Sequence, residues 1–176
     1  MIENRILPPR ENYLGEISRN TNTFITIHES SDGTGYAEDN RTLEYYENRL
    51  RNPPKGLEQI GCHFFVSDSH IVQFIPINVR TAHAGTTEGN NSIGIERLVN
   101  RFIDFPTAIA NQAKLTATLM HMFNIPIENV VTHKHWSGKE CPARLLAGLN
   151  GGWEGFISQV MNFYETGDIF DITKIK

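Results

Sequence analysis

Two histidines and one cysteine, far apart in the sequence, carry side chains that bind zinc in proteins. His28 and His133 each end a run of residues predicted to form a strand, and Cys141 follows eight residues after His133, across a loop that contains Gly138. Strand ends hold a side chain rigidly while leaving it open to solvent. Two imidazoles and one thiolate suit Zn²⁺ and leave its fourth tetrahedral position for water. Structural zinc sites usually have four protein ligands, so a set of three indicates a catalytic metal site.

Glu96 and Lys139 are the candidates for proton transfer and for stabilising negative charge. Side chains alternate along a strand, so Gly94 and Glu96 share one face while Ile95 points to the other. A carboxylate at the end of an apolar strand is costly unless it has a partner or a task, and near a zinc-bound water it would act as a general base. Lys139 lies two residues before Cys141, so its ammonium would stand at the rim of the same site and stabilise an oxyanion.

Each of these residues also has an ordinary structural interpretation. Single histidines are often hydrogen-bonded core or surface residues, and His135 competes for the second ligand position. The cysteine would be a small buried apolar residue, or would form a disulfide with Cys62. The glutamate would pair on the surface with Arg97 or Arg101, and the lysine would be a solvated loop residue.

The elements that must position these side chains alternate loosely between strands and helices. Residues 1–22 are polar and predict an irregular lead-in, residues 29–35 predict a loop, and the final stretch over 165–176 has no clear assignment. Strands are predicted over 24–28, 62–66, 71–75, 92–98 and 129–133, and helices over 37–51, 108–123, 142–149 and 153–164. Two of the strands form a hairpin across a polar turn. The pattern predicts an α/β fold with a central mixed β-sheet flanked by helices.

Composition narrows the classes of function. The chain has 176 residues, 39% of them hydrophobic, which fits one domain with a real core. The net charge of −4 gives no broad basic field for nucleic acid or an anionic membrane. No apolar run approaches the ~20 residues that span a bilayer. Residues 1–10 are polar and show no secretory signal, so the two cysteines are expected to be reduced thiols.

Five segments in register carry a resemblance to a known family. They cover 24–28, 61–66, 75–85, 91–96 and 132–142, and their order and spacing agree along roughly residues 23 to 147. The last of them reads Thr-His-Lys-His-Trp-Ser-Gly-Lys-Glu-Cys-Pro. The chain resembles the zinc-dependent N-acetylmuramoyl-L-alanine amidases of type 2. This group includes phage endolysins, bacterial autolysins and, more distantly, peptidoglycan-recognition proteins.

The resemblance assigns roles to the residues singled out above. It implies that His28, His133 and Cys141 are the zinc ligands, and so selects between the two histidines of the last segment. Glu96 matches an acidic residue implicated in catalysis in the endolysin and autolysin branch. Lys139 matches a residue needed for catalysis in some phage members.

Three further residues lie in the matching segments. His83 matches a position that lines the substrate groove of the family. His63 would orient substrate or contact the metal ligands, and is equally well placed to be structural within its strand. Some phage members carry a tyrosine that assists catalysis at the position of Cys62, and its absence here favours Glu96 as the base.

The implied reaction is hydrolysis of the amide between the lactyl group of N-acetylmuramic acid and L-alanine in peptidoglycan, with zinc activating the water. Two alternatives remain open: a non-catalytic peptidoglycan-binding module, and a cytosolic amidase that recycles soluble muropeptides. In the peptidoglycan-recognition group, loss of the cysteine ligand accompanies binding without hydrolysis, so Cys141 favours the enzyme.

The missing secretory signal fits an endolysin that is made in the cytoplasm and acts on the bacterial cell wall after release. We expect a single catalytic domain over 1–176 with its core at about 23–164. Residues 165–176 would be a tail, or the start of a linker to a wall-binding domain beyond the C-terminus.

Overall fold

A six-stranded mixed sheet forms the centre of the molecule. The structure, a computed structural model, describes residues 1–8, 14–20, 22–31 and 41–176. The strands within these residues are β1 (Ile2–Asn4), β2 (Ile25–Glu29), β3 (Phe64–Val66), β4 (Ile71–Gln73), β5 (Ile93–Arg97) and β6 (Val130–Thr132). They lie in the order β1-β4-β3-β5-β2-β6, and each pair of neighbours is parallel except the β3–β4 hairpin. The predicted α/β fold with a mixed sheet is confirmed.

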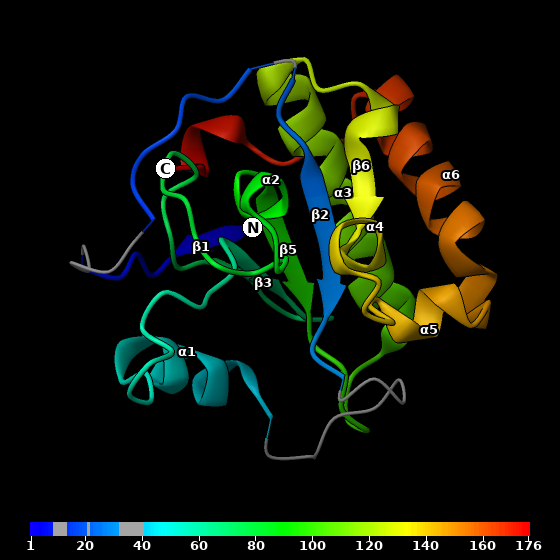
Figure 1. The fold of residues 1–176 in the computed structure, drawn as a ribbon. Helices are drawn as coiled ribbons and strands as arrows, with labels where there is room; N and C mark the ends of the chain where they lie inside the picture. The colour runs from blue at the N-terminus through cyan, green and yellow to red at the C-terminus, as the bar shows by residue number, and fades with distance from the viewer. Residues whose placement is uncertain (9–13, 21, 32–40) are drawn as a thin grey trace.

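Helices cover both faces of this sheet. They are α1 (Leu43–Arg51), α2 (Thr87–Asn90), α3 (Phe105–Phe123), α4 (His133–Ser137), α5 (Ala143–Leu146) and α6 (Gly152–Thr166), with short 3₁₀ turns η1 (Ile127–Asn129), η2 (Leu149–Gly151) and η3 (Ile172–Lys174). Figure 1 shows α3 behind the sheet with α6 beside it, and α2 and α4 in front of the strands. The long α3 starts with Pro106 in its first turn and stops where Asn124 adopts a left-handed φ of 53°.

The two faces of β2 and β5 have different chemistry because side chains alternate along a strand. Ile27 and Ile95 lie in the main hydrophobic core, which includes residues of α3. Burying each such side chain contributes about 1.5–3 kcal/mol, so the register of these strands is strongly specified. His28 and Glu96 are therefore turned to the opposite face, where they are direct partners in the parallel register.

A second hydrophobic cluster attaches α1 to that opposite face. Leu43 and Leu50 of α1 are buried in it together with Phe65 of β3 and Val72 of β4. The helix begins after Thr42, whose side chain accepts a hydrogen bond from the backbone N–H of Tyr45. Because α1 is fixed on the same face as His28 and Glu96, it forms one wall of any cleft there.

Both ends of the chain pack against the domain. The prediction of an irregular lead-in is wrong at its start, because Ile2–Asn4 pairs with Ile71–Gln73 as β1. Three residues are too few to show an alternating pattern, which is why the sequence does not reveal this strand. The C-terminal stretch packs on the domain: Ile175 is buried, and the backbone N–H of Lys176 donates to Gln73 Oε1 at 2.9 Å.

Other predicted elements are present with shifted bounds. The strand predicted over 129–133 ends at Thr132, whose side chain caps α4, so His133 belongs to a helix. The hairpin predicted over 62–66 and 71–75 is confirmed with three residues in each strand. The predicted helix over 37–51 begins at Leu43 within the described residues, and residues 32–40 lie outside them. No helix within the described part of the chain is long and apolar enough to cross a membrane.

Candidate active site

Helix α4 carries His133 to the end of β2. Trp136 Nε1 donates a hydrogen bond to Thr26 Oγ1 at 2.8 Å, which fastens α4 over the strand that bears His28. The loop after α4 turns back, and the backbone N–H of Lys134 donates to the carbonyl oxygen of Cys141 at 3.1 Å. These two contacts bring Cys141 and both histidines to one point on the open face of the sheet.

The three predicted ligands form a compact, buried group. The nitrogen and sulfur atoms that His28, His133 and Cys141 offer all lie within 4.8 Å of one another. The two imidazole centroids are 4.7 Å apart with the rings at 69°, and His28 Nδ1 is 4.0 Å from Cys141 Sγ. Their positions match the ligand set predicted from the sequence, and their metal-binding role remains a prediction.

The donor atoms of this group fit a zinc ion. Nδ1 of His133 is buried and has no hydrogen-bond partner within the described residues. Because buried polar atoms normally have a partner, this nitrogen is available to bind a ligand. Burial, followed by the positive charge of Lys139, lowers the pKa of His133 to about 4. Burial, followed by His83 and His133, also holds the pKa of His28 well below its usual value. Both rings are thus neutral near pH 7 and keep a lone pair for a metal.

The thiol of Cys141 is protonated in the absence of a cation. Burial, followed by the nearby carboxyl of Glu96, raises its pKa to about 12. A metal binds the thiolate, so the ion must displace this proton on binding. Cys62 and Cys141 are both free and buried, so no disulfide competes for the sulfur, as the sequence predicts.

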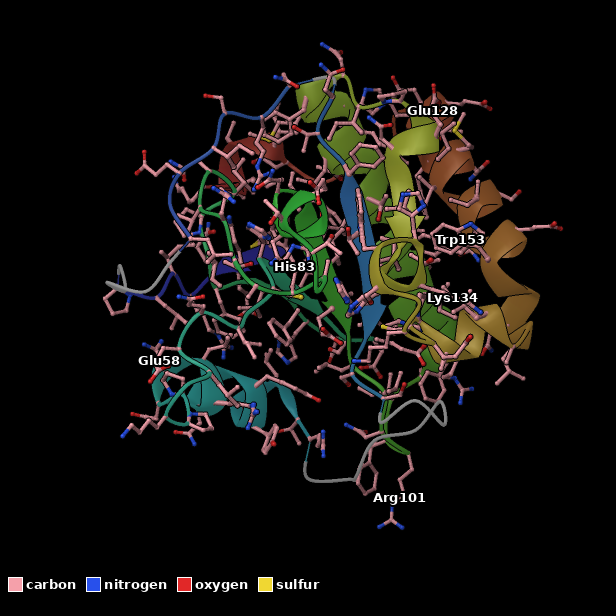
Figure 2. The ribbon with its side chains drawn as sticks, viewed as in Figure 1. Glu58, His83, Arg101, Glu128, Lys134 and Trp153 are labelled. Carbon is pink, nitrogen blue, oxygen red and sulfur yellow. The ribbon has the colours of Figure 1, made fainter. Side chains whose placement is uncertain are left out.

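His83 contacts the ring of His28 and determines which nitrogen of that ring is free. His83 Nε2 lies 3.2 Å from the carbonyl oxygen of Ser92 and must donate to it. The neutral ring then accepts at Nδ1, which is 2.9 Å from Nε2 of His28. His28 therefore carries its proton on Nε2 and presents an unprotonated Nδ1 toward Cys141. His83 lies near the middle of the molecule in the view of Figure 2.

Glu96 is partly buried beside the group, and Arg97, one of the two arginines considered as its partner, pairs elsewhere. The thiol of Cys62 donates a hydrogen bond to Glu96 Oε2 across 3.5 Å. Burial raises the pKa of Glu96 to about 7, although the hydrogen bond from Cys62 and the charge of Lys139 act in the opposite direction. A carboxyl that titrates near neutral pH is suited to accept and return a proton. The alternative in which Glu96 pairs with Arg97 is wrong.

Arg97 instead forms a buried ion pair with Glu29 on the core face of the sheet. Arg97 Nη2 lies 2.6 Å from Glu29 Oε2, and both side chains are fully buried. The other carboxylate oxygen of Glu29 accepts from the backbone N–H of Arg144 at 3.0 Å, and its carbonyl oxygen is 3.8 Å from Cys141 Sγ. This pair fixes the segment that carries the cysteine. Sequence reasoning missed it, although Glu29 follows Ile27 by two residues and so shares its face.

Of the remaining predicted residues, Lys139 and His135 are exposed and His63 is buried. Lys139 is exposed and lines the cleft described below. His135 is exposed and stacks on Phe24, with the ring centroids 6.4 Å apart, and it is not part of the ligand group. His63 is fully buried: its Nδ1 accepts from the backbone N–H of Gly94 at 3.0 Å, and its Nε2 contacts the carbonyl oxygen of Val79 at 2.8 Å. These contacts favour the structural alternative for His63.

A cleft of about 250 Å³ connects the ligand group to α1. At one end it is lined by the candidate ligands with His83, Glu96 and Lys139, and at the other by Arg49, Leu50 and Pro53. The sequence analysis assigned no residue of α1 to the site. Helical spacing identifies the buried face of a helix, but it does not show which part of the molecule the residues beside that face contact.

A second group of potential ligands overlaps the first. Nitrogen and sulfur atoms of His28, Cys62 and His83 also lie within 4.8 Å of one another. Here the facing nitrogens of the two histidines already share a hydrogen bond of 2.9 Å. The group containing His133, with its unpartnered nitrogen, is the better cation site.

The chain matches known proteins along most of its length. Residues 18–144 match a family model described as N-acetylmuramoyl-L-alanine amidase. The N-acetylmuramoyl-L-alanine amidase XlyA of Bacillus subtilis is 39% identical over 142 residues, which cover 75% of this chain and 46% of that protein. For the amidase CwlH of the same organism the identity is 36%, with 78% and 52% covered. The chain therefore spans about half the length of the curated relatives that it matches.

Solved structures have the same fold. The catalytic domain of XlyA superimposes with a TM-score of 0.73 at 34% identity, covering 91% of this chain and 99% of that domain. PlyL gives a TM-score of 0.69 at 28% identity, covering 91% of this chain and 96% of that one. The Staphylococcus aureus hydrolase AmiA, at 15% identity, has a TM-score of 0.72 over 96% of this chain and 86% of its own, and shows the fold alone.

Proposed function

The chain belongs to the N-acetylmuramoyl-L-alanine amidase family, and we propose that it hydrolyses the amide joining N-acetylmuramic acid to L-alanine in peptidoglycan. The observation that carries this proposal is the group of His28, His133 and Cys141, whose ligand atoms lie within 4.8 Å beside a carboxyl with a pKa of about 7. A binding module needs neither a metal site nor a base, whereas hydrolysis of an amide needs both an activated water and a proton carrier.

His28 and His133 would bind Zn²⁺ through Nδ1, and Cys141 through its sulfur. When bound, zinc supplies Lewis-acid polarisation of the scissile carbonyl and activation of the attacking water. With three protein ligands, the site keeps a coordination position for chemistry. His83 would keep the ring of His28 in the tautomer that binds.

Glu96 would accept the proton of the attacking water and deliver it to the departing alanine nitrogen. Its side chain projects from β5 on the same face as His28, and the thiol of Cys62 orients one carboxylate oxygen. Lys139, on the exposed rim, would stabilise the negative charge that develops on the carbonyl oxygen. The buried pair of Glu29 and Arg97 would hold the cysteine segment without taking part in the reaction.

Digestion of purified cell walls tests the proposal. The wild-type protein should release new L-alanine amino groups, and mass spectrometry should locate the cleaved bond next to the lactyl group. Cys141→Ser should lose zinc and lytic activity together, whereas Cys62→Ser should keep its zinc and serves as the matched thiol control. Wild-type levels of zinc and lysis in Cys141→Ser would show that the ligand assignment is wrong.

Two alternatives give different results in the same experiment. A non-catalytic peptidoglycan-binding module would bind walls without releasing amino groups. A muropeptide-recycling amidase would cleave small soluble muropeptides and leave intact walls unchanged.

We propose the bacterial cell wall as the place of action, with synthesis in the cytoplasm followed by release. A wall-binding domain beyond residue 176 also remains a prediction, which sedimentation with walls would test by comparing this chain with a longer one.

A further inference from the structure

Among the described residues, the lining of the cleft has more cationic than acidic side chains, although the chain as a whole is acidic. The chain has a net charge of −4, yet Arg41, Arg49 and Lys139 line the cleft. Of the two acidic residues that line the cleft within the described part of the chain, Glu29 is neutralised by its buried ion pair with Arg97. A cleft of one sign of charge with low-dielectric walls concentrates ligands of the opposite sign.

Arg49 is the cationic residue of α1 that is free to bind a ligand. Arg5 and Arg51 both lie 2.9 Å or less from oxygens of Glu47, so the surface charges around this helix are largely paired. Arg49, in contrast, has no hydrogen-bond or ion-pair partner within the described part of the chain, and it faces the cleft beside Leu50 and Pro53. A guanidinium in a partly apolar wall is a receptor for a carboxylate, which it can bind with two parallel hydrogen bonds.

The chemistry of the proposed substrate indicates where that carboxylate comes from. On the glycan side of the scissile amide, the muramic acid carboxyl is itself part of the bond, so the glycan is uncharged. On the peptide side, L-alanine is followed by a D-glutamate linked through its side chain, whose α-carboxyl is either free or amidated. That group lies within two residues of the scissile bond, or about 7 Å of extended chain.

We propose that Arg49 binds the free α-carboxylate of the second stem residue, so that the protein prefers peptidoglycan in which this carboxyl is not amidated. The inference rests on the proposed function, because it places the scissile amide at His28, His133 and Cys141 and the stem peptide along the cleft toward α1. The orientation follows from charge: only the peptide side offers an anion to Arg49.

Two soluble substrates that differ by one charge test this. They are N-acetylmuramoyl-L-alanyl-γ-D-glutamyl-L-lysine amide and its isoglutaminyl counterpart. We expect the wild-type kcat/KM to be about fivefold higher for the free acid. This ratio corresponds to the free energy that one solvent-exposed ion pair contributes. Arg49→Gln should bring the ratio to about one by slowing the acid substrate only. Arg51→Gln, on the same helix but paired outside the cleft, should keep the wild-type ratio.

The outcomes separate this inference from the proposed function. Equal rates for the two peptides in the wild-type protein, or an unchanged preference in Arg49→Gln, would overturn the role of Arg49 while wall hydrolysis stands. Absence of wall hydrolysis by the wild-type protein, measured in parallel, would overturn the amidase proposal itself. The preference should also weaken as salt is raised from low ionic strength to about 0.5 M, because exposed charges are screened.

Discussion

Replacing His83 by phenylalanine should weaken zinc binding although His83 is not a proposed ligand. The ring of His83 accepts the Nε2 proton of His28 at 2.9 Å and is itself anchored on the carbonyl oxygen of Ser92 at 3.2 Å. Phenylalanine fills the same space without an acceptor. The buried Nε2–H of His28 then loses its partner, and nothing favours the tautomer that leaves Nδ1 unprotonated toward the proposed zinc site.

The size of the effect follows from the contacts. Leaving one buried donor unsatisfied costs about 1–3 kcal/mol, and His28 is only 2% exposed, so water does not replace the lost acceptor. When the ring reorients or changes tautomer to recover a partner, that free energy is taken from metal binding. We expect the dissociation constant for zinc to rise about 10–100-fold, the range measured when such supporting contacts are removed at other zinc sites.

Competition titration of zinc against a chelating dye measures the constant directly. His83→Asn, which can place an amide oxygen near the position of Nδ1, should recover part of the affinity. His135→Phe is the matched control, because His135 is exposed and lies outside the ligand group. Circular dichroism of each metal-free variant separates unfolding from a binding defect. Wild-type zinc affinity in a folded His83→Phe protein would refute the argument that this contact selects the tautomer.

Three further predictions rest on other contacts. Burial raises the pKa of Glu96 from its usual 4.5 to about 7. Because the base must be ionised, kcat on wall fragments should rise with pH up to about 7, or up to a lower pH when a bound cation lowers this pKa. Glu96→Gln should keep its zinc, lose most of the turnover and lose this rise with pH. Arg97→Met leaves the carboxylate of Glu29 buried without its partner and should lower the free energy of unfolding in urea by about 3–5 kcal/mol. In Gly94→Ala the new Cβ would lie 2.8 Å from His83 Nδ1, so the ring must move, and the chelator titration should show zinc affinity falling as it does in His83→Phe.

Much of the fold follows from patterns that the sequence displays directly. In the segments that end in His28 and Glu96, isoleucines alternate with residues of other types, as expected for a strand with one buried face. Both strands and the faces that carry His28 and Glu96 could therefore be predicted. The family resemblance was confirmed because it rested on several segments in register rather than on one motif. What lay beyond prediction depends on partners distant in the chain: β1 has three residues and exists only beside β4.

The choice between His133 and His135 shows why local pattern was insufficient there. On a strand, residues two apart face the same side, so both histidines would have pointed at the metal group. Thr132 accepts a hydrogen bond from the backbone N–H of His135 at 3.2 Å and starts a helix at His133. Residues two apart on a helix are separated by about 200°, so one ring is buried and the other exposed. A single capping side chain thus makes the site specific for one histidine.

Cys62 illustrates how a departure from the family pattern is resolved by the surrounding structure. A tyrosine at this position would bring a hydroxyl of its own, whereas the thiol of Cys62 is a weak donor and has its pKa raised by burial and by Glu96. It therefore stays protonated and donates to Glu96 Oε2 across 3.5 Å. Under the proposed function, proton transfer would then depend on the carboxyl of Glu96, and the thiol of Cys62 would only orient that carboxyl. For that reason Cys62→Ser should keep turnover within about tenfold of the wild-type value, while Glu96→Gln should not.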